Sequence, residues 1–89
     1  IQTANATAAM LHKKGCDLVI CLSHLGDRYQ ENKVSDEILA KESYDIDLII
    51  GGHTHRFFEE PRKYTNKKGG VVAVNQVGFG GIQLGRLEY

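Results

Sequence analysis

The chain has 89 residues, of which 42% are hydrophobic and 25% are charged, values that are ordinary for one small globular domain. Eleven basic residues balance eleven acidic ones, so the net charge gives no indication of binding to a nucleic acid polymer or an acidic membrane. No apolar run approaches the ~20 residues that a membrane-spanning helix needs, so no membrane span is expected.

Residues 1–14 have the pattern of a helix with one apolar face. The apolar residues recur at helical spacing and form a single stripe: Ile1, Ala4, Ala8 and Leu11. Lys13 and Lys14 suit the negative end of the helix dipole, and Gly15 suits the position just past a helix. The pattern therefore predicts a helix that ends near Gly15.

Residues 16–23 form a strand-like run in which odd and even positions from Leu18 to Leu22 are all apolar. His24 follows the run directly. Such a run is typical of a parallel strand that helices cover on both faces. Cys16 and Cys21 lie five residues apart, so in an extended strand their side chains face opposite ways and cannot pair. We expect two unpaired thiols buried in the core.

Residues 27–33 are polar and lack a period, so they predict a loop directly after His24. Asp27 and Arg28 could meet a substrate there, but a solvated surface loop is the simpler interpretation. Ser35 suits a helix N-cap, with Asp36 and Glu37 in the first turn where the dipole favours carboxylates. This second helix is expected to reach about residue 43.

Residues 48–50 predict a second buried strand, followed by Gly51-Gly52-His53-Thr54-His55. The glycines allow a sharp turn, and the spacing of the histidines lets both imidazoles point the same way in an extended chain. Converging neutral imidazoles are good ligands for zinc-, manganese- or iron-like ions. A polar loop with two solvated histidines is the alternative.

His24 occupies the same place after the first strand as His53 and His55 do after the second. Ligands of parallel sheets gather at the carboxyl ends of the strands, so the three histidines are expected to converge there. Asp45 and Asp47 precede the second strand and would lie at the opposite end.

The last third of the chain predicts antiparallel strands. Residues 62–64 and 71–77 flank a polar, glycine-ended link and read as a hairpin. After a turn at residues 78–81, residues 82–89 predict a further strand with a bulge at Gly85 and Arg86. The fold class is therefore α/β, with a parallel β-α-β core and an antiparallel C-terminal hairpin.

The segments Ser23-His24-Leu25-Gly26, 45–55, 75–81 and 84–87 together resemble the calcineurin-like metallophosphoesterases, in particular their 5′-nucleotidase branch. The resemblance covers nearly the whole chain and implies half of an αββα sandwich. The family's Asp-x-His and Gly-Asn-His motifs do not occur here, and the chain starts at Ile1 without an initiator methionine. We therefore interpret residues 1–89 as part of a catalytic domain whose N-terminal half is absent.

The resemblance also implies a chemistry. In the full-length protein two divalent ions of the zinc, manganese or iron class would activate a water for attack on a nucleotide or another phosphate ester. His24 and His53 would bind one ion, and His55 the other. Because a bridging carboxylate is missing, the chain alone is expected to be inactive. The branch is commonly periplasmic or cell-surface. A non-catalytic binding or assembly module and a mononuclear three-histidine zinc domain are the alternatives.

Overall fold

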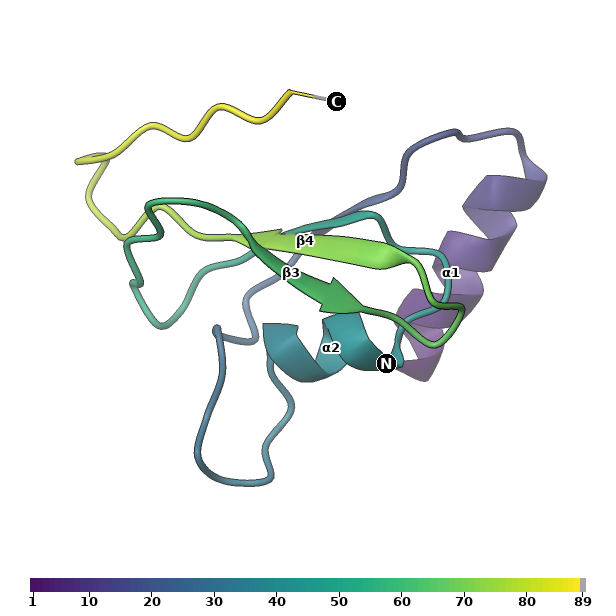
Figure 1. The fold of residues 1–89 in the computed structure, drawn as a ribbon, viewed down its shortest axis with the longest axis horizontal. Coiled ribbons are helices and arrows are strands. Elements are labelled where there is room, and N and C mark those ends of the chain that lie inside the picture. Colours follow the sequence, from purple (N-terminus) through teal and green to yellow (C-terminus); the bar gives the residue numbers. More distant parts are fainter. Residues whose placement is uncertain (89) are drawn as a thin grey trace.

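The computed structural model describes residues 1–88, which form two helices and one four-stranded sheet (Figure 1). In chain order the elements are α1 (Gln2–Lys13), β1 (Ile20–Leu22), α2 (Asp36–Glu42), β2 (Leu48–Ile50), β3 (Arg62–Thr65) and β4 (Val71–Asn75). The strand order is β1-β2-β4-β3, with β1, β2 and β4 parallel and β3 antiparallel to β4. The predicted α/β class, the parallel β-α-β core and the antiparallel hairpin are confirmed.

Both predicted helices form at the expected places. In α1 Ala8 is buried in the core, Ala4 and Leu11 pack against it, and Gly15 follows with a φ of 95°. In α2 the Ser35 hydroxyl caps the helix by accepting a hydrogen bond from the Ile38 amide at 3.3 Å. Capping and the apolar stripe therefore set these two helices locally.

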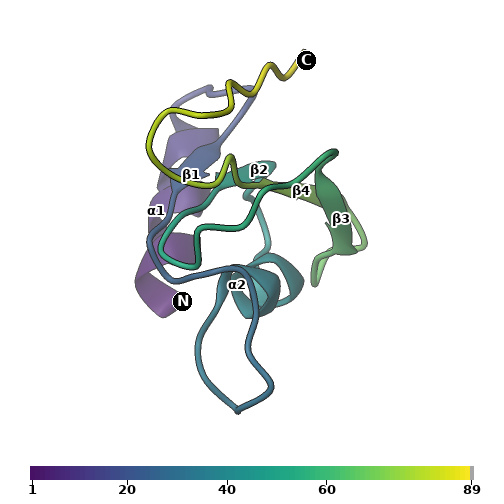
Figure 2. The ribbon, with the colours of Figure 1, turned by 90° about the vertical axis from the view of Figure 1, so that its left-hand side faces the viewer.

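The core lies between the helices and one face of the sheet. Nine hydrophobic residues are buried there: Ala8, Val19, Leu39, Ala40, Ile46, Ile49, Phe58, Val72 and Val74. Figure 2 shows α2 on one side of the sheet, while the C-terminal segment passes over the other.

The prediction that β1 is covered on both faces is wrong. Ile20 is 47% exposed and Leu22 is 80% exposed, and Ile50 of β2 is also exposed on the same face. Buried residues of both helices share one core with Val19 and Ile49, whereas Ile20, Leu22 and Ile50 on the opposite face of the sheet stay in solvent. The expected burial of both thiols is also wrong for Cys16, which is exposed, whereas Cys21 is half-buried.

The predicted hairpin is confirmed as β3 and β4, which pair from Arg62↔Val74 to Thr65↔Val71. The predicted last strand is wrong, because residues 82–88 form no strand and the bulge at Gly85 and Arg86 is not made. β4 is already paired with β2 and β3, so it has no free edge for the tail to join. Tyr89 lies outside the described residues.

Neither α1 nor α2 is long and apolar enough to cross a membrane, and residues 1–88 contain no other helix.

Candidate functional site

The parallel strands β1, β2 and β4 end at one edge of the sheet, at the left of Figure 1. Two backbone hydrogen bonds tie the departing loops to one another. The Ser23 amide donates to the Ile50 carbonyl, and the Gly51 amide donates to the Asn75 carbonyl, each at 2.9 Å. The loops that carry the histidines therefore begin side by side.

His24 and His53 meet at this edge. Their ring centroids lie 5.1 Å apart, with the ring planes at 67°, and both side chains are exposed. Gly52 runs beside them, since a Cβ at this position would lie 3.4 Å from Nδ1 of His24. The absent side chain of Gly52 keeps the space next to the His24 ring open.

The separation of the two histidine rings matches that of two imidazoles bound to one divalent ion. With zinc–nitrogen bonds of about 2.0–2.1 Å at a tetrahedral angle, two imidazole centroids lie roughly 5 Å apart. The separation of the His24 and His53 rings is close to that distance. The imidazole nitrogen is also a type of donor that zinc, manganese and iron accept.

The His55 ring contacts Phe79, whereas the His24 and His53 rings contact each other. The centroids of the His55 and Phe79 rings lie 5.2 Å apart. The expected extended backbone is wrong, because His53 and His55 have φ values of 71° and 55°, in the left-handed region. Within residues 1–88 no three His, Cys, Asp or Glu side chains gather as a ready metal site.

The two aspartates before β2 lie away from the histidines, at the amino end of the strand as expected. Asp47 Oδ2 accepts a hydrogen bond from the Val19 amide at 2.9 Å, and Asp45 pairs with Lys68 at 2.6 Å. His12, the fourth histidine, is exposed near the same end and lies 3.1 Å from the Asp45 carbonyl.

Asp36 is a residue of the site edge that the sequence pattern did not reveal. Its side chain is fully buried, and Oδ1 accepts a hydrogen bond from the Ser23 hydroxyl at 2.5 Å. Oδ2 has no hydrogen-bond partner among residues 1–88, and a Cβ at Gly51 would collide with it. Burial raises the pKa of the Asp36 carboxyl, an effect that the Ser23 hydrogen bond opposes.

Asp27, which the sequence placed in the loop after His24, is also buried at this end of the sheet, so the solvated loop expected there is wrong at this position. The side chain is 1% exposed, and Arg62 of β3 binds both of its carboxylate oxygens. The Asp27 amide donates to the Thr54 hydroxyl at 3.1 Å, which joins the His24 loop to the His53 loop. Arg28 is exposed, as expected.

Gln76 is a buried glutamine at the end of β4 whose amide reaches into the loop of His53 and His55. Two signals in the sequence indicated it: its place in residues 75–81, which carry part of the resemblance, and its strand parity with Val72 and Val74, which face the core.

Comparison with known proteins relates this chain to phosphoesterases, several of which are named as acting on nucleotides. Residues 2–57 match the model of the calcineurin-like phosphoesterase family. The chain is 36% identical over 61 residues to an apyrase of Aedes aegypti, covering 68% of this chain and 10% of that protein. It is 33% identical over 78 residues to a 2′,3′-cyclic-nucleotide 2′-phosphodiesterase/3′-nucleotidase of Haemophilus influenzae. That match covers 84% of this chain and 12% of the relative.

Two further relatives extend the match. A trifunctional nucleotide phosphoesterase of Bacillus subtilis is 33% identical over 84 residues, covering 94% of this chain and 5% of that protein. The crystal structure of a 5′-nucleotidase precursor from Thermus thermophilus superposes with a TM-score of 0.68 at 30% identity, covering 84% of this chain and 16% of that one. The chain thus spans about a tenth of the length of the first curated relatives it matches. It belongs to the calcineurin-like phosphoesterase family, in the branch of the 5′-nucleotidases and related nucleotide phosphoesterases.

Proposed function

We propose that residues 1–89 are part of the catalytic domain of a metal-dependent phosphoesterase that hydrolyses nucleotide-like phosphate monoesters. The observation that carries the proposal is the His24–His53 pair at the carboxyl ends of neighbouring parallel strands, with centroids 5.1 Å apart. Sites of open parallel sheets lie at this end. The names of the relatives, which are nucleotide phosphoesterases and nucleotidases, support the substrate class.

In this proposal His24, His53 and His55 are the metal ligands that this chain supplies. Divalent ions held there would supply the activated water and neutralise charge on the phosphoryl oxygens. The histidines contribute neutral nitrogen donors, which leave the positive charge of an ion undiminished. Gly52 leaves the space beside the His24 ring open, because it carries no side chain that would fill it, whereas the absent side chain of Gly51 makes room for the Asp36 carboxyl.

The assignment of His55 to a second ion rests on the family resemblance. His24 and His53 lie together, whereas the His55 ring packs on Phe79. A two-ion site needs a bridging carboxylate. Both Asp27 oxygens are bound to Arg62, and Asp36 is buried against Ser23 and Gly51. We therefore propose that the chain alone is inactive and that the full-length protein supplies the bridge.

The test is hydrolysis of a nucleoside monophosphate by the full-length protein with added manganese or zinc, compared between wild type and the variants His53→Ala and His12→Ala. His53→Ala should lower turnover roughly 1,000-fold, equivalent to about 4 kcal/mol of barrier. His12→Ala is the matched control, because His12 lies by the Asp45 carbonyl at the other end of the sheet. Wild-type turnover in the His53→Ala protein would refute the site.

Location is a second part of the proposal. We infer that the full-length protein acts outside the cytoplasm, in the periplasm or at the cell surface. The relative from Thermus thermophilus is a precursor, which supports export. Cell fractionation with an antibody against the chain tests this, and a wholly cytoplasmic signal would contradict it.

A further inference from the structure

Gln76 is a buried polar side chain that the proposed function does not use. It follows β4 directly and is 1% exposed. Its amide reaches into the loop after β2, which carries His53 and His55. A glutamine is rarely buried unless its polar atoms are hydrogen-bonded. The hydrogen bonds of the Gln76 amide therefore account for its burial.

Both polar atoms of the Gln76 amide bind the backbone of that loop. Oε1 accepts a hydrogen bond from the Arg56 amide at 2.8 Å, and Nε2 donates to the Gly52 carbonyl at 3.0 Å. This orientation is the one that satisfies both partners, because a flipped amide would set its NH2 group against the Arg56 N–H. The two contacts clamp the loop on either side of His53 and His55.

Thr54, between the two histidines, completes the clamp. Its hydroxyl lies 3.1 Å from Nε2 and 3.3 Å from Oε1 of Gln76, and it accepts a hydrogen bond from the Asp27 amide at 3.1 Å. Asp27 belongs to the loop of His24. The Gln76–Thr54 contact therefore couples the loops that follow β1, β2 and β4.

The backbone shows why a clamp is needed. His53 and His55 have φ values of 71° and 55°, which non-glycine residues adopt uncommonly. Such conformations persist only where the surroundings over-determine them. The Gln76 side chain binds Gly52, Thr54 and Arg56, the residues that alternate with the two histidines.

We propose that Gln76 is a positioning residue, which fixes the backbone of residues 52–56 and thereby sets the directions in which His53 and His55 present their rings. The inference deepens the proposed function and rests on it for the metal-binding role of the histidines. It does not make Gln76 a ligand, because both ends of its amide are occupied by the protein. Small displacements of ligands cost large factors in binding and rate, which is why a rigid loop matters here.

The test uses the full-length protein with Gln76→Leu, Gln76→Glu and the matched control Gln83→Leu. Leucine removes every contact at similar size. Glutamate keeps an acceptor for the Arg56 amide but loses the donor to the Gly52 carbonyl. Gln83 is also half-buried and donates to the Phe58 carbonyl at 3.0 Å, outside the histidine loop. Two quantities are measured: hydrogen exchange of the Arg56 amide, and the manganese concentration for half-maximal hydrolysis of a nucleoside monophosphate.

Gln76→Leu should speed exchange of the Arg56 amide at least 10-fold and raise the manganese requirement about 10- to 100-fold. Gln76→Glu should leave Arg56 protected and raise the requirement less. Gln83→Leu should change neither quantity more than about twofold. A wild-type manganese requirement in Gln76→Leu would overturn the inference, because a purely structural role leaves that requirement unchanged. If the wild-type protein shows no metal-dependent hydrolysis, the proposed function fails, while unchanged Arg56 exchange in Gln76→Leu would separately overturn the clamp.

Discussion

Asp36 is a buried carboxyl beside the loops that carry His24 and His53, and its burial changes its pKa. It begins α2, where the helix dipole favours a negative charge, yet its side chain is fully buried. The Ser23 hydroxyl binds one oxygen, and Gly51 lies against the other. Burial raises the pKa of this carboxyl, and the nearby Asp27 charge acts in the same direction.

We expect this raised pKa to make stability depend on pH. A carboxyl with a raised pKa in the folded state binds its proton more tightly there than in the unfolded chain. Its contribution is therefore full below the ordinary pKa of 3.8 and is lost as pH rises through the raised value. Asp36→Asn cannot titrate, so it should not show that loss. The difference in melting temperature, Asp36→Asn minus wild type, should therefore grow as the pH is raised from about 3 to about 7.

Asp17→Asn is the control, since Asp17 is exposed. Thermal melts of both variants and wild type across this pH range decide the matter. A difference between Asp36→Asn and wild type that stays constant with pH would show that the carboxyl does not titrate as described.

At the scale of elements, the Asp27–Arg62 pair joins the loop before α2 to β3. Arg62 binds both Asp27 oxygens, and its guanidinium lies 4.4 Å from the centroid of the Phe58 ring. Asp27 is buried, whereas the Arg62 side chain is 32% exposed. Among residues 1–88, Arg62 is therefore the one ion-pair partner of the buried Asp27 carboxylate.

Arg62→Met should destabilise the fold by about 3 kcal/mol, the lower end of the range for breaking a buried ion pair, because Arg62 is partly exposed. The double variant Asp27→Asn/Arg62→Met should recover part of that loss, since no charge is left buried. Urea unfolding measures both. Arg86→Met is the matched control, as Arg86 pairs with Glu88 in solvent and should change stability by less than about 0.5 kcal/mol. Equal losses in the single and double variants would contradict the account.

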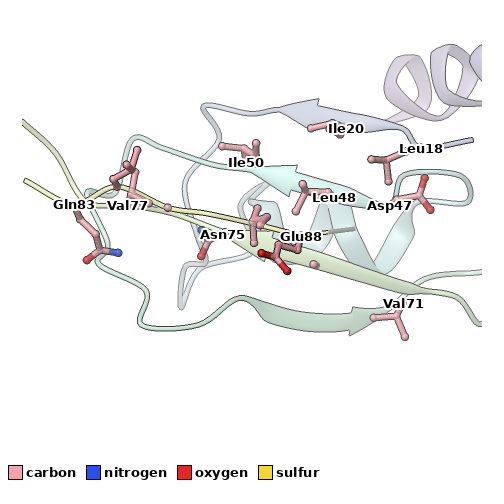
Figure 3. A pocket seen from close by; sticks show the side chains of 14 residues that line it. Leu18, Ile20, Asp47, Leu48, Ile50, Val71, Asn75, Val77, Gln83 and Glu88 are labelled. Atoms are coloured by element: carbon pink, nitrogen blue, oxygen red, sulfur yellow. The ribbon is translucent and has the colours of Figure 1, made fainter. Parts of the chain in front are cut away.

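At the scale of the whole molecule, the sheet has one packed face and one open face. Figure 3 shows the open face, where apolar side chains of β1, β2 and β4 line a groove beneath the C-terminal segment. The groove is lined by Leu18, Ile20, Leu48, Ile50, Val77 and Leu84, among others. Exposed apolar surfaces of this kind are uncommon on soluble monomers.

The 89-residue chain should therefore bind the dye ANS strongly in its folded state. Replacing Ile20 and Ile50 by threonine should lower the dye fluorescence by roughly half, because both side chains lie in the groove. Met10→Thr is the control, since Met10 is 47% exposed on α1 and lies outside the groove. Unchanged fluorescence in the Ile20/Ile50 variant would show that the groove does not take up the dye.

The sequence by itself determined the elements with strong local signals. The stripe of α1, the Ser35 cap of α2, the apolar run of β2 and the turn between β3 and β4 are each encoded by neighbouring residues. Parallel pairing then put His24 and His53 at the same edge of the sheet, as predicted. Their role as metal ligands, with His55, stays a prediction.

Only the tertiary structure decided which partners distant residues find. Asp27 and Arg62 are 35 positions apart, and Gln76 binds a loop 20 to 24 positions earlier, so no local period encodes either contact. The same is true of the open face of the sheet, because an apolar run predicts burial without saying what covers it. The left-handed backbone of His53 and His55 belongs here too, since the Gln76 contacts on either side of the two histidines join segments 20 to 24 positions apart.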